Sequence, residues 1–273
     1  PGLTPRLFAP ERLGPDVSLG CSGWGTEMED FIFQTWVDRK PHLFLISQRD
    51  GNWGEPEPLA FADAYEIGDF TVAADGRTVI FESSRLSVSD NSVSKAGDLW
   101  TITRSDTGWT KPRPLGPPIN TAYHESYPCL AANGNLFFFS RKPGGFGESD
   151  LYMSVLADGK YQEPVNLGPR FNTAQHEWDP FVAPDESYLV FCSMKPGGLG
   201  EDDLYVSFRG ADGAWGDPVH LGDSINSEKS ENRPYVSPDG KCLFYTSTRN
   251  GHRQIFWVDA AILESLRPGK EDK

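Results

Sequence analysis

Short apolar runs separated by tight turns recur along the chain. Four copies of one pattern occur, each with an apolar run, a turn around DG, NG or PDE, and a second apolar run. They span residues 65–83 (YEIGDFTVAADGRTVIFES), 124–140 (HESYPCLAANGNLFFFS), 176–193 (HEWDPFVAPDESYLVFCS) and 230–247 (SENRPYVSPDGKCLFYTS). A turn of this kind between two apolar runs is typical of a β-hairpin. We therefore predict one hairpin in each copy.

Two further segments keep the same period. A third apolar strand is expected five times, at residues 42–46, 98–102, 150–154, 203–207 and 254–258. A Pro-x-x-Leu segment also occurs five times, and its leading prolines are Pro10, Pro56, Pro112, Pro164 and Pro218. Four strands in about 50 residues, repeated along the chain, indicate the blades of a β-propeller.

The five Pro-x-x-Leu segments are shifted by one unit relative to the five third-strand segments. One Pro-x-x-Leu segment precedes every other strand, and none follows the last third-strand segment. We therefore expect an all-β, five-bladed propeller with four antiparallel strands per blade, in which the N-terminal strand closes the last blade. A closed ring leaves only short, protected sheet edges. Six blades would require a degenerate unit within the first 25 or so residues.

These expectations give one domain over residues 1–273. The predicted blades span residues 17–60, 64–116, 123–168, 175–222, and 229–260 together with 7–14, and a short C-terminal helix is expected at about 260–267. The connection between second and third strands has nearly the same sequence in two blades, KPGGFGESDLY at 142–152 and KPGGLGEDDLY at 195–205. We expect Asp98, Asp150 and Asp203 to bond nearby backbone donors there. The ordered spacing of a calcium loop is missing.

The repeats resemble a known family. YVSPDGKCLFYTSTRNG with the following QIFWV, and SRKPGGFGESDLY, are similar to the PD40 repeat, the WD40-like propeller unit of TolB-type proteins. The resemblance covers about residues 8–260. It implies an exported, periplasmic bacterial protein with a binding surface at one end of the ring. TolB-type proteins carry an additional N-terminal domain, for which this chain has no room. Fold alone does not license a function.

Four glutamates occupy one slot of the repeat, three residues before the Pro or Asp that opens an inner strand: Glu66, Glu125, Glu177 and Glu231. The first strand of each blade lines the channel of a propeller, so these carboxylates are expected to converge at its mouth. Converging like charges recruit a cation or raise one another's pKa. Alternatively, each glutamate caps its own blade by bonding backbone amides. Asp16 is a weak candidate for the equivalent position of the first blade.

Other side chains are candidates at the same mouth. His124 and His176 precede two of the glutamates and could hold a divalent metal ion as a cofactor. Alternatively, the HE dipeptide merely reflects duplication of the repeat. A cation row follows the second strands, and from it Arg141 and Arg249 are candidates to bind a carboxylate-bearing ligand or to pair with the glutamates. Trp178 and Asp179 lie in HEWDP, where an off-pattern indole could stack on a sugar ring or simply pack locally.

Composition limits the classes of partner that the protein is expected to bind. The formal charge is −14 and the pI about 4.8, so nucleic acid is not expected as a partner. No apolar run approaches the roughly 20 residues of a membrane span, and no signal peptide is visible at the start. The four cysteines are expected to be buried free thiols, and no CxxC pair occurs.

The sequence therefore favours a non-catalytic binding or scaffold propeller, expected to be a monomer, with a protein or an oligosaccharide bound at the acidic mouth. The alternative is a glycan-active enzyme. It would be a glycoside hydrolase using Glu125, Glu177, Asp179 or Glu231, or a metal-dependent lyase built on His124 and His176. No G-x-S-x-G motif or phosphate-binding glycine loop suggests another chemistry.

Overall fold

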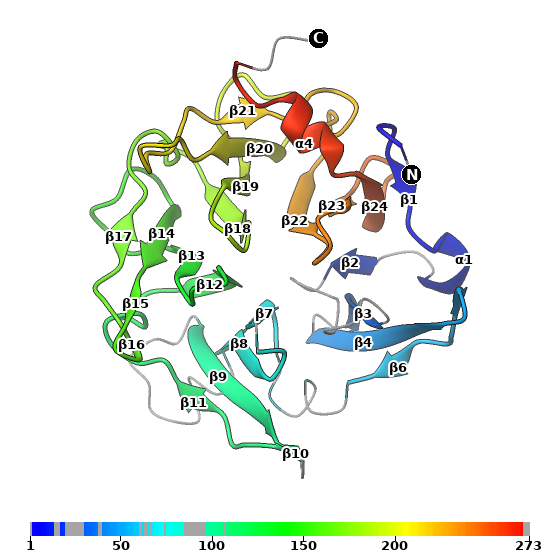
Figure 1. The fold of residues 1–273 in the computed structure, drawn as a ribbon, viewed down its shortest axis with the longest axis horizontal. Helices are drawn as coiled ribbons and strands as arrows, with labels where there is room; N and C mark the ends of the chain where they lie inside the picture. The colour runs from blue at the N-terminus through cyan, green and yellow to red at the C-terminus, as the bar shows by residue number, and fades with distance from the viewer. Residues whose placement is uncertain are drawn as a thin grey trace.

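The computed structural model describes residues 2–13, 17–19, 30–37, 40–59, 62, 65, 67–73, 75–84, 97–105 and 108–269. Five antiparallel sheets stand around a central axis, as the sequence predicts for a five-bladed propeller (Figure 1). Within the described ranges, no helix is both long enough and apolar enough to cross a membrane. The cysteines of these ranges, Cys129, Cys192 and Cys242, are free thiols, and Cys21 lies outside them.

We number the blades in chain order. Blade 1 contains β2 (Val17–Leu19), β3 (Asp30–Val37), β4 (Lys40–Arg49), β5 (Asn52–Trp53) and β6 (Glu57–Pro58). Blade 2 contains β7 (Phe70–Val72), β8 (Thr78–Ser83), β9 (Asp98–Ser105), β10 (Gly108–Trp109) and β11 (Arg113–Pro114). Blade 3 contains β12 (Glu125–Leu130), β13 (Leu136–Ser140), β14 (Asp150–Ser154) and β17 (Val165–Asn166), with a small hairpin of β15 (Leu156–Ala157) and β16 (Lys160–Tyr161) beside it.

The last two blades follow the same plan. Blade 4 contains β18 (Glu177–Val182), β19 (Tyr188–Ser193), β20 (Asp203–Phe208) and β21 (Val219–His220). Blade 5 contains β22 (Glu231–Val236), β23 (Cys242–Ser247), β24 (Gln254–Asp259) and, from the other end of the chain, β1 (Arg6–Leu7). The two named helices are short, α1 (Pro10–Leu13) and α4 (Ala261–Ser265).

The N-terminus closes the ring, as expected. In β1, Arg6 pairs with Trp257 and Leu7 with Phe256 of β24. Phe8 then buries its ring against Phe31 of blade 1 and Phe244 of blade 5, at centroid distances of 4.6 and 5.2 Å. Apolar contacts therefore continue across the junction where the ring is closed without a covalent link.

The middle strands are buried on both faces, because each blade is packed between two neighbours. In β19, every residue after Tyr188 is buried, and in β13 every residue is buried. This accounts for the continuous apolar runs LFFFS and YLVFCS, which lack the alternation of a half-exposed sheet.

The hairpin turns form where the sequence predicts them. In blade 5, the Gly240 N–H donates to the Ser237 carbonyl at 2.8 Å, with a Gly240 φ of +71°.

Repeated asparagines fasten the segments that lead into blades 3, 4 and 5 to the blade before each. Asn172 accepts the N–H of Leu151 at 2.8 Å and donates to its carbonyl at 3.1 Å. Asn120 and Asn226 make the same pair of bonds to Leu99 and Leu204. The signal is present in the sequence as IN, FN and IN before the inner strands of blades 3, 4 and 5. It was not among the predicted features.

Asp150 and Asp203 fix the connections between second and third strands in blades 3 and 4, as expected, whereas the connection before Asp98 lies outside the described residues. Asp150 accepts the N–H groups of Phe146 and Gly147 at 2.7 and 3.0 Å, and Asp203 accepts that of Leu199 at 2.6 Å. Each connection also rests on the loop of the next blade. A side chain on Gly147 would come within 2.1 Å of the Gln175 carbonyl oxygen.

Candidate functional site

The predicted glutamates open their inner strands but lie within the blades. Glu125, Glu177 and Glu231 are each 0% exposed. Glu177 accepts the backbone N–H of Thr173 at 2.8 Å, the Thr173 hydroxyl at 2.7 Å and the Ser193 hydroxyl at 2.9 Å. Glu125 and Glu231 make equivalent bonds, so these three carboxylates occupy the blade-capping position of the structural alternative. Glu66 lies outside the described residues, as does Asp16.

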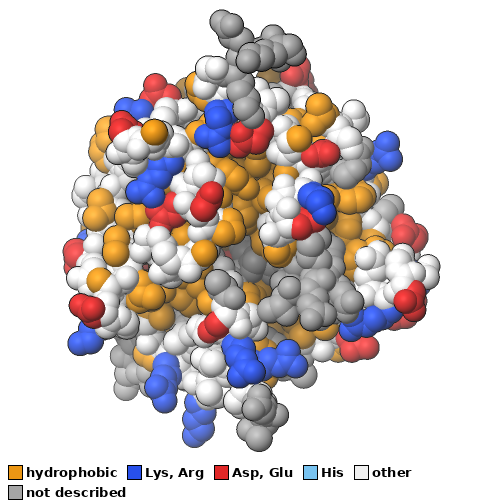
Figure 2. Space-filling view, viewed as in Figure 1, with side chains coloured by type: hydrophobic (Ala, Val, Ile, Leu, Met, Phe, Trp, Pro, Cys, Tyr) orange, Lys and Arg blue, Asp and Glu red, His pale blue; other side chains and the backbone are white. Residues whose placement is uncertain are grey.

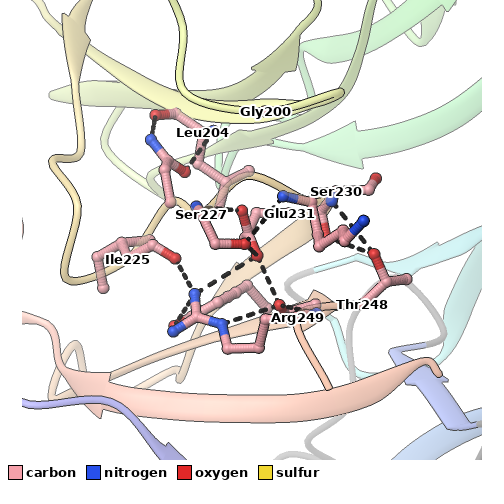
Figure 3. Close-up of polar contacts among 12 residues, drawn as sticks. Gly200, Leu204, Ile225, Ser227, Ser230, Glu231, Thr248 and Arg249 are labelled. Atoms are coloured by element: carbon pink, nitrogen blue, oxygen red, sulfur yellow. Dashed lines mark hydrogen bonds and ion pairs between the residues drawn. The ribbon is translucent and has the colours of Figure 1, made fainter. Parts of the chain in front are cut away.

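The two candidate arginines are placed differently. The guanidinium of Arg249 joins the cap around Glu231, donating to Glu231 at 3.4 Å, to the Ser247 hydroxyl at 3.0 Å and to the Ile225 carbonyl (Figure 3). It also lies over the ring of Phe256. Arg141 is exposed, and its backbone N–H donates to the His124 carbonyl. Arg249 is therefore engaged inside blade 5.

The two histidines lie in different seams between blades. Burial, with the charge of Arg141, lowers the pKa of His124 to about 4, and its ring meets Phe139 edge-on. His176 lies 2.9 Å from Glu148, 3.1 Å from the Ser149 hydroxyl, and stacks on Trp178 at 5.1 Å. Among the described residues, no group of three His, Cys, Asp or Glu side chains is arranged to hold a metal ion.

The contact of Ser149, His176 and Glu148 superficially resembles a nucleophile site. Ser149 is only 1% exposed and does not line the hollow described below. The same backbone bridge recurs between Asp202 and Ser230 in the next seam. The arrangement is therefore a repeated contact between blades. Trp178 also serves packing, since its indole N–H donates to the Cys192 sulfur at 2.7 Å.

Three neighbouring inner strands share a bulge that the sequence pattern does not reveal. The register of β12, β18 and β22 shifts between Ser126 and Cys129, between Trp178 and Phe181, and between Asn232 and Tyr235. Inside each bulge one residue has a left-handed backbone: Tyr127 (φ +51°), Asp179 (φ +50°) and Arg233 (φ +53°). Each is followed by proline, which has no N–H to leave unpaired in a bulge.

The bulge residues meet at the axis. The Arg233 backbone N–H donates to Asp179 at 2.9 Å, and its guanidinium donates to the Tyr127 hydroxyl at 3.1 Å. The same guanidinium donates to Gln34 at 2.7 Å and forms an ion pair with Asp69 at 3.2 Å. We call these five residues the axial cluster. Each of the five blades contributes one of them.

A hollow of about 470 Å³ lies beside this cluster. Its floor includes Tyr127, Asp179 and Arg233, and its walls run along the inner strands to the hairpin turns at Ala132, Pro184 and Gly240. These turns lie at the opposite end of the axis from the starts of the inner strands. The mouth was predicted at the strand starts, so the hollow lies at the other end of the axis. On the face shown in Figure 2, hydrophobic side chains gather around the axis, and many charged ones lie nearer the rim.

Asp179 is electrostatically unusual. It is 5% exposed, and burial raises its pKa to about 8, reinforced by the charges of Asp69 and Asp202 and opposed by Arg233. One carboxyl oxygen accepts the Arg233 N–H, whereas Oδ1 has no hydrogen-bond partner among the described residues. Near Asp69, burial and the charges of Asp69 and Asp98 raise the pKa of Glu82 to about 8. Both carboxyls are therefore largely protonated at pH 7.

Of the axial cluster, sequence reasoning singled out only Asp179. Tyr127, Arg233, Asp69 and Gln34 were not predicted as site residues. A signal existed for the first two, because the position two residues after the repeated glutamate changes from Tyr to Asp to Arg while the following proline stays constant. Gln34 and Asp69 carry no comparable signal.

Comparison with known proteins supports the fold. No family model and no curated protein sequence matches the chain. Among solved structures, an α-L-arabinofuranosidase from Lactobacillus brevis is similar with a TM-score of 0.58 and 11% identity, over 92% of this chain and 93% of that one. A putative TolB from Agrobacterium tumefaciens has a TM-score of 0.51 and 14% identity, over 85% of this chain and 70% of that one.

TolB from Acinetobacter baumannii is also similar, with a TM-score of 0.49 and 11% identity. The match covers 86% of this chain and only 53% of the TolB chain. Identities this low establish the architecture and nothing finer. The chain is a five-bladed β-propeller whose structural neighbours include TolB proteins and a glycoside hydrolase.

Proposed function

We propose that this protein is a non-catalytic binding propeller whose ligand occupies the axial hollow, which Tyr127, Asp179 and Arg233 of the axial cluster line. The observation that carries this proposal is the difference between three equivalent positions. Tyr127, Asp179 and Arg233 occupy the same bulge of successive blades, yet they differ in charge, size and hydrogen-bonding capacity. A residue that serves the repeat tends to recur in it, as Glu125, Glu177 and Glu231 do.

The geometry supports recognition in two further ways. A left-handed backbone at a non-glycine residue costs of the order of 1–3 kcal/mol, and such strained residues cluster at functional sites. Three of them surround one point here. The hollow of about 470 Å³ also falls within the size range of small-molecule sites, which are mostly apolar with a few placed polar groups.

A second candidate is a glycan-active enzyme, favoured by two observations. The likeness to the arabinofuranosidase covers more than nine tenths of both chains. The cluster also holds two carboxyls in different environments, Asp179 with a pKa raised to about 8 and Asp69 paired with Arg233. Two such carboxyls are the minimum for glycoside hydrolysis.

A blocked-hollow variant tests the proposal. Ala132 lines the hollow and is exposed, so Ala132→Trp places an indole in it, while Ala214→Trp adds the same bulk at an exposed position that does not line it. Both proteins would be screened by thermal shift against oligosaccharides and small organic cations, anions and neutral compounds. A ligand at 100 times its Kd adds about 2.7 kcal/mol.

Stabilisation that Ala132→Trp abolishes and Ala214→Trp preserves is the expected result. Equal stabilisation of both variants would contradict a site in the hollow. Incubation of the wild type with p-nitrophenyl arabinofuranoside separates the two candidates, because release of nitrophenol that Asp179→Asn abolishes would establish the enzyme.

The cellular location is also a proposal. The likeness of the repeats to those of TolB-type envelope proteins supports an exported, periplasmic protein. Fractionation of the cells that express it tests this. Recovery with periplasmic markers is expected, and recovery with cytoplasmic markers would contradict it.

A further inference from the structure

We infer that the ligand of the axial hollow is an organic cation, with a protonated amine at Oδ1 of Asp179 and an apolar body against the proline and tyrosine wall. This inference rests on the proposed function, since it names the chemical class that the hollow would take.

The charge pattern of the hollow provides the first argument. Among the described residues that line it, only Asp179 and Arg233 are charged. The guanidinium of Arg233 already contacts Gln34, Tyr127 and Asp69. Asp179 instead has one carboxyl oxygen, Oδ1, that no described residue satisfies; this oxygen is buried beside the hollow, so the side chain must turn for a ligand to reach it. A buried polar atom without a partner is costly, so a donor from a ligand would be stabilising there.

The groups that face Asp179 favour a cationic donor over a neutral one. Arg233 of β22 is the cation next to it, and Tyr127 of β12 meets the same guanidinium. Asp69, before β7, and Asp202, before β20, both act on Asp179 as negative charges, and the Cys192 thiol of β19 also lies within its electrostatic reach. Carboxyls therefore outnumber the single guanidinium around this oxygen.

The wall provides the second argument. Five prolines line the hollow: Pro128, Pro180, Pro184, Pro234 and Pro238. Four aromatic rings accompany them: Tyr127, Phe181, Tyr188 and Tyr235. Such a wall offers few hydrogen bonds for the many hydroxyls of a sugar, but it suits an apolar body. Aromatic faces also attract an ammonium group.

Binding should release a proton. Without ligand, burial keeps the Asp179 carboxyl protonated at pH 7. When an ammonium group pairs with the carboxylate, the carboxyl proton leaves to solvent and the ammonium keeps its own protons. The affinity for an amine should therefore rise about tenfold from pH 6 to 7 and about fivefold from pH 7 to 8, where the free carboxyl begins to ionise.

Isothermal titration with matched probes tests the inference. The probes are 2-phenylethylamine, its neutral isostere 2-phenylethanol and the anion phenylacetate, each titrated at pH 6, 7 and 8. We expect the amine to bind most tightly, with the stated pH dependence and with release of about one proton at pH 7 when buffers of different ionisation heat are compared. The alcohol should show no pH dependence.

Asp179→Asn should abolish the preference for the amine. The amide is an isostere of the neutral carboxyl, so the fold should be retained, and Asp212→Asn at an exposed turn is the control. Should Asp179→Asn fail to fold, the pH dependence and proton release of the wild type still decide the question.

The outcomes distinguish failure of the ligand site in the hollow from failure of the cationic ligand class. A probe or sugar that binds in an Ala132→Trp-sensitive manner, without preference for the amine, leaves the binding site standing and overturns the cationic ligand. Amine binding that Ala132→Trp leaves intact overturns both.

Discussion

At the scale of the residue, the inner carboxyls combine two opposite roles. Glu177 and its two equivalents each accept from at least three donors and close their own blades. Asp179, two residues further along, has a buried oxygen beside a hollow, and none of the described residues donates to it. A strand without a bulge would place both on the same face. The left-handed residue breaks this alternation and turns the second position toward the axis.

The pKa of Asp179 predicts a decline of stability with rising pH. Its folded-state pKa of about 8 exceeds the ordinary value of 3.8, so the folded protein retains a proton that the unfolded chain loses. This contribution is complete below about pH 4 and is lost as pH rises to 8, with an upper limit of roughly 6 kcal/mol. Asp179→Asn should flatten the decline, leaving the part due to Glu82. Urea unfolding at pH 5, 6.5 and 8 measures it, and parallel curves for both proteins would contradict it.

Glu177→Gln should destabilise the protein without any ligand. The amide offers one oxygen to three donors and turns an N–H₂ group toward at least one of them, which we expect to cost about 2–4 kcal/mol. Glu163→Gln is the control, because its exposed ion pair with Lys142 should contribute less than about 1 kcal/mol. Chemical denaturation measures both variants. Equal, small losses would mean that Glu177 is not structural.

At the scale of the element, the connections between second and third strands require glycine, because no side chain fits at these positions. Gly147→Ala would place a methyl group within 2.1 Å of the Gln175 carbonyl and 2.4 Å of that of Thr173. Overpacking against backbone should cost about 1–3 kcal/mol. Gly54→Ala, where the nearest atom lies at 3.4 Å, is the matched control. Thermal denaturation that fails to distinguish the two variants would contradict this account of the loop.

The sequence was most informative about the secondary-structure elements and their order in the ring. The hairpins, the third strands and the ring closure follow from local turn residues and from a period that is visible in one sequence. The bulges were missed because an extra residue in an inner strand leaves the apolar pattern intact. The axial cluster was missed for a different reason. Gln34 and Arg233 are 199 residues apart, and only the closed ring brings them together.

At the scale of the whole molecule, stability depends on the closure of the ring. Phe8 is buried among Phe31, Trp53, Phe244 and Trp257, which belong to the first and last blades. Phe8→Ala should cost about 3–5 kcal/mol, whereas Leu3→Ala, which is exposed, should change stability by less than about 0.5 kcal/mol. Thermal unfolding compares them, and similar midpoints would show that the junction contributes little.

The central claim is that the ring presents its ligand site at the axial cluster. A crystal structure of the protein with the tightest-binding compound of the thermal-shift panel tests it most directly. The account predicts electron density in the hollow, between the tyrosine and proline wall and Asp179. Density at the opposite end of the axis beside Arg141, or on the outer rim, would contradict it.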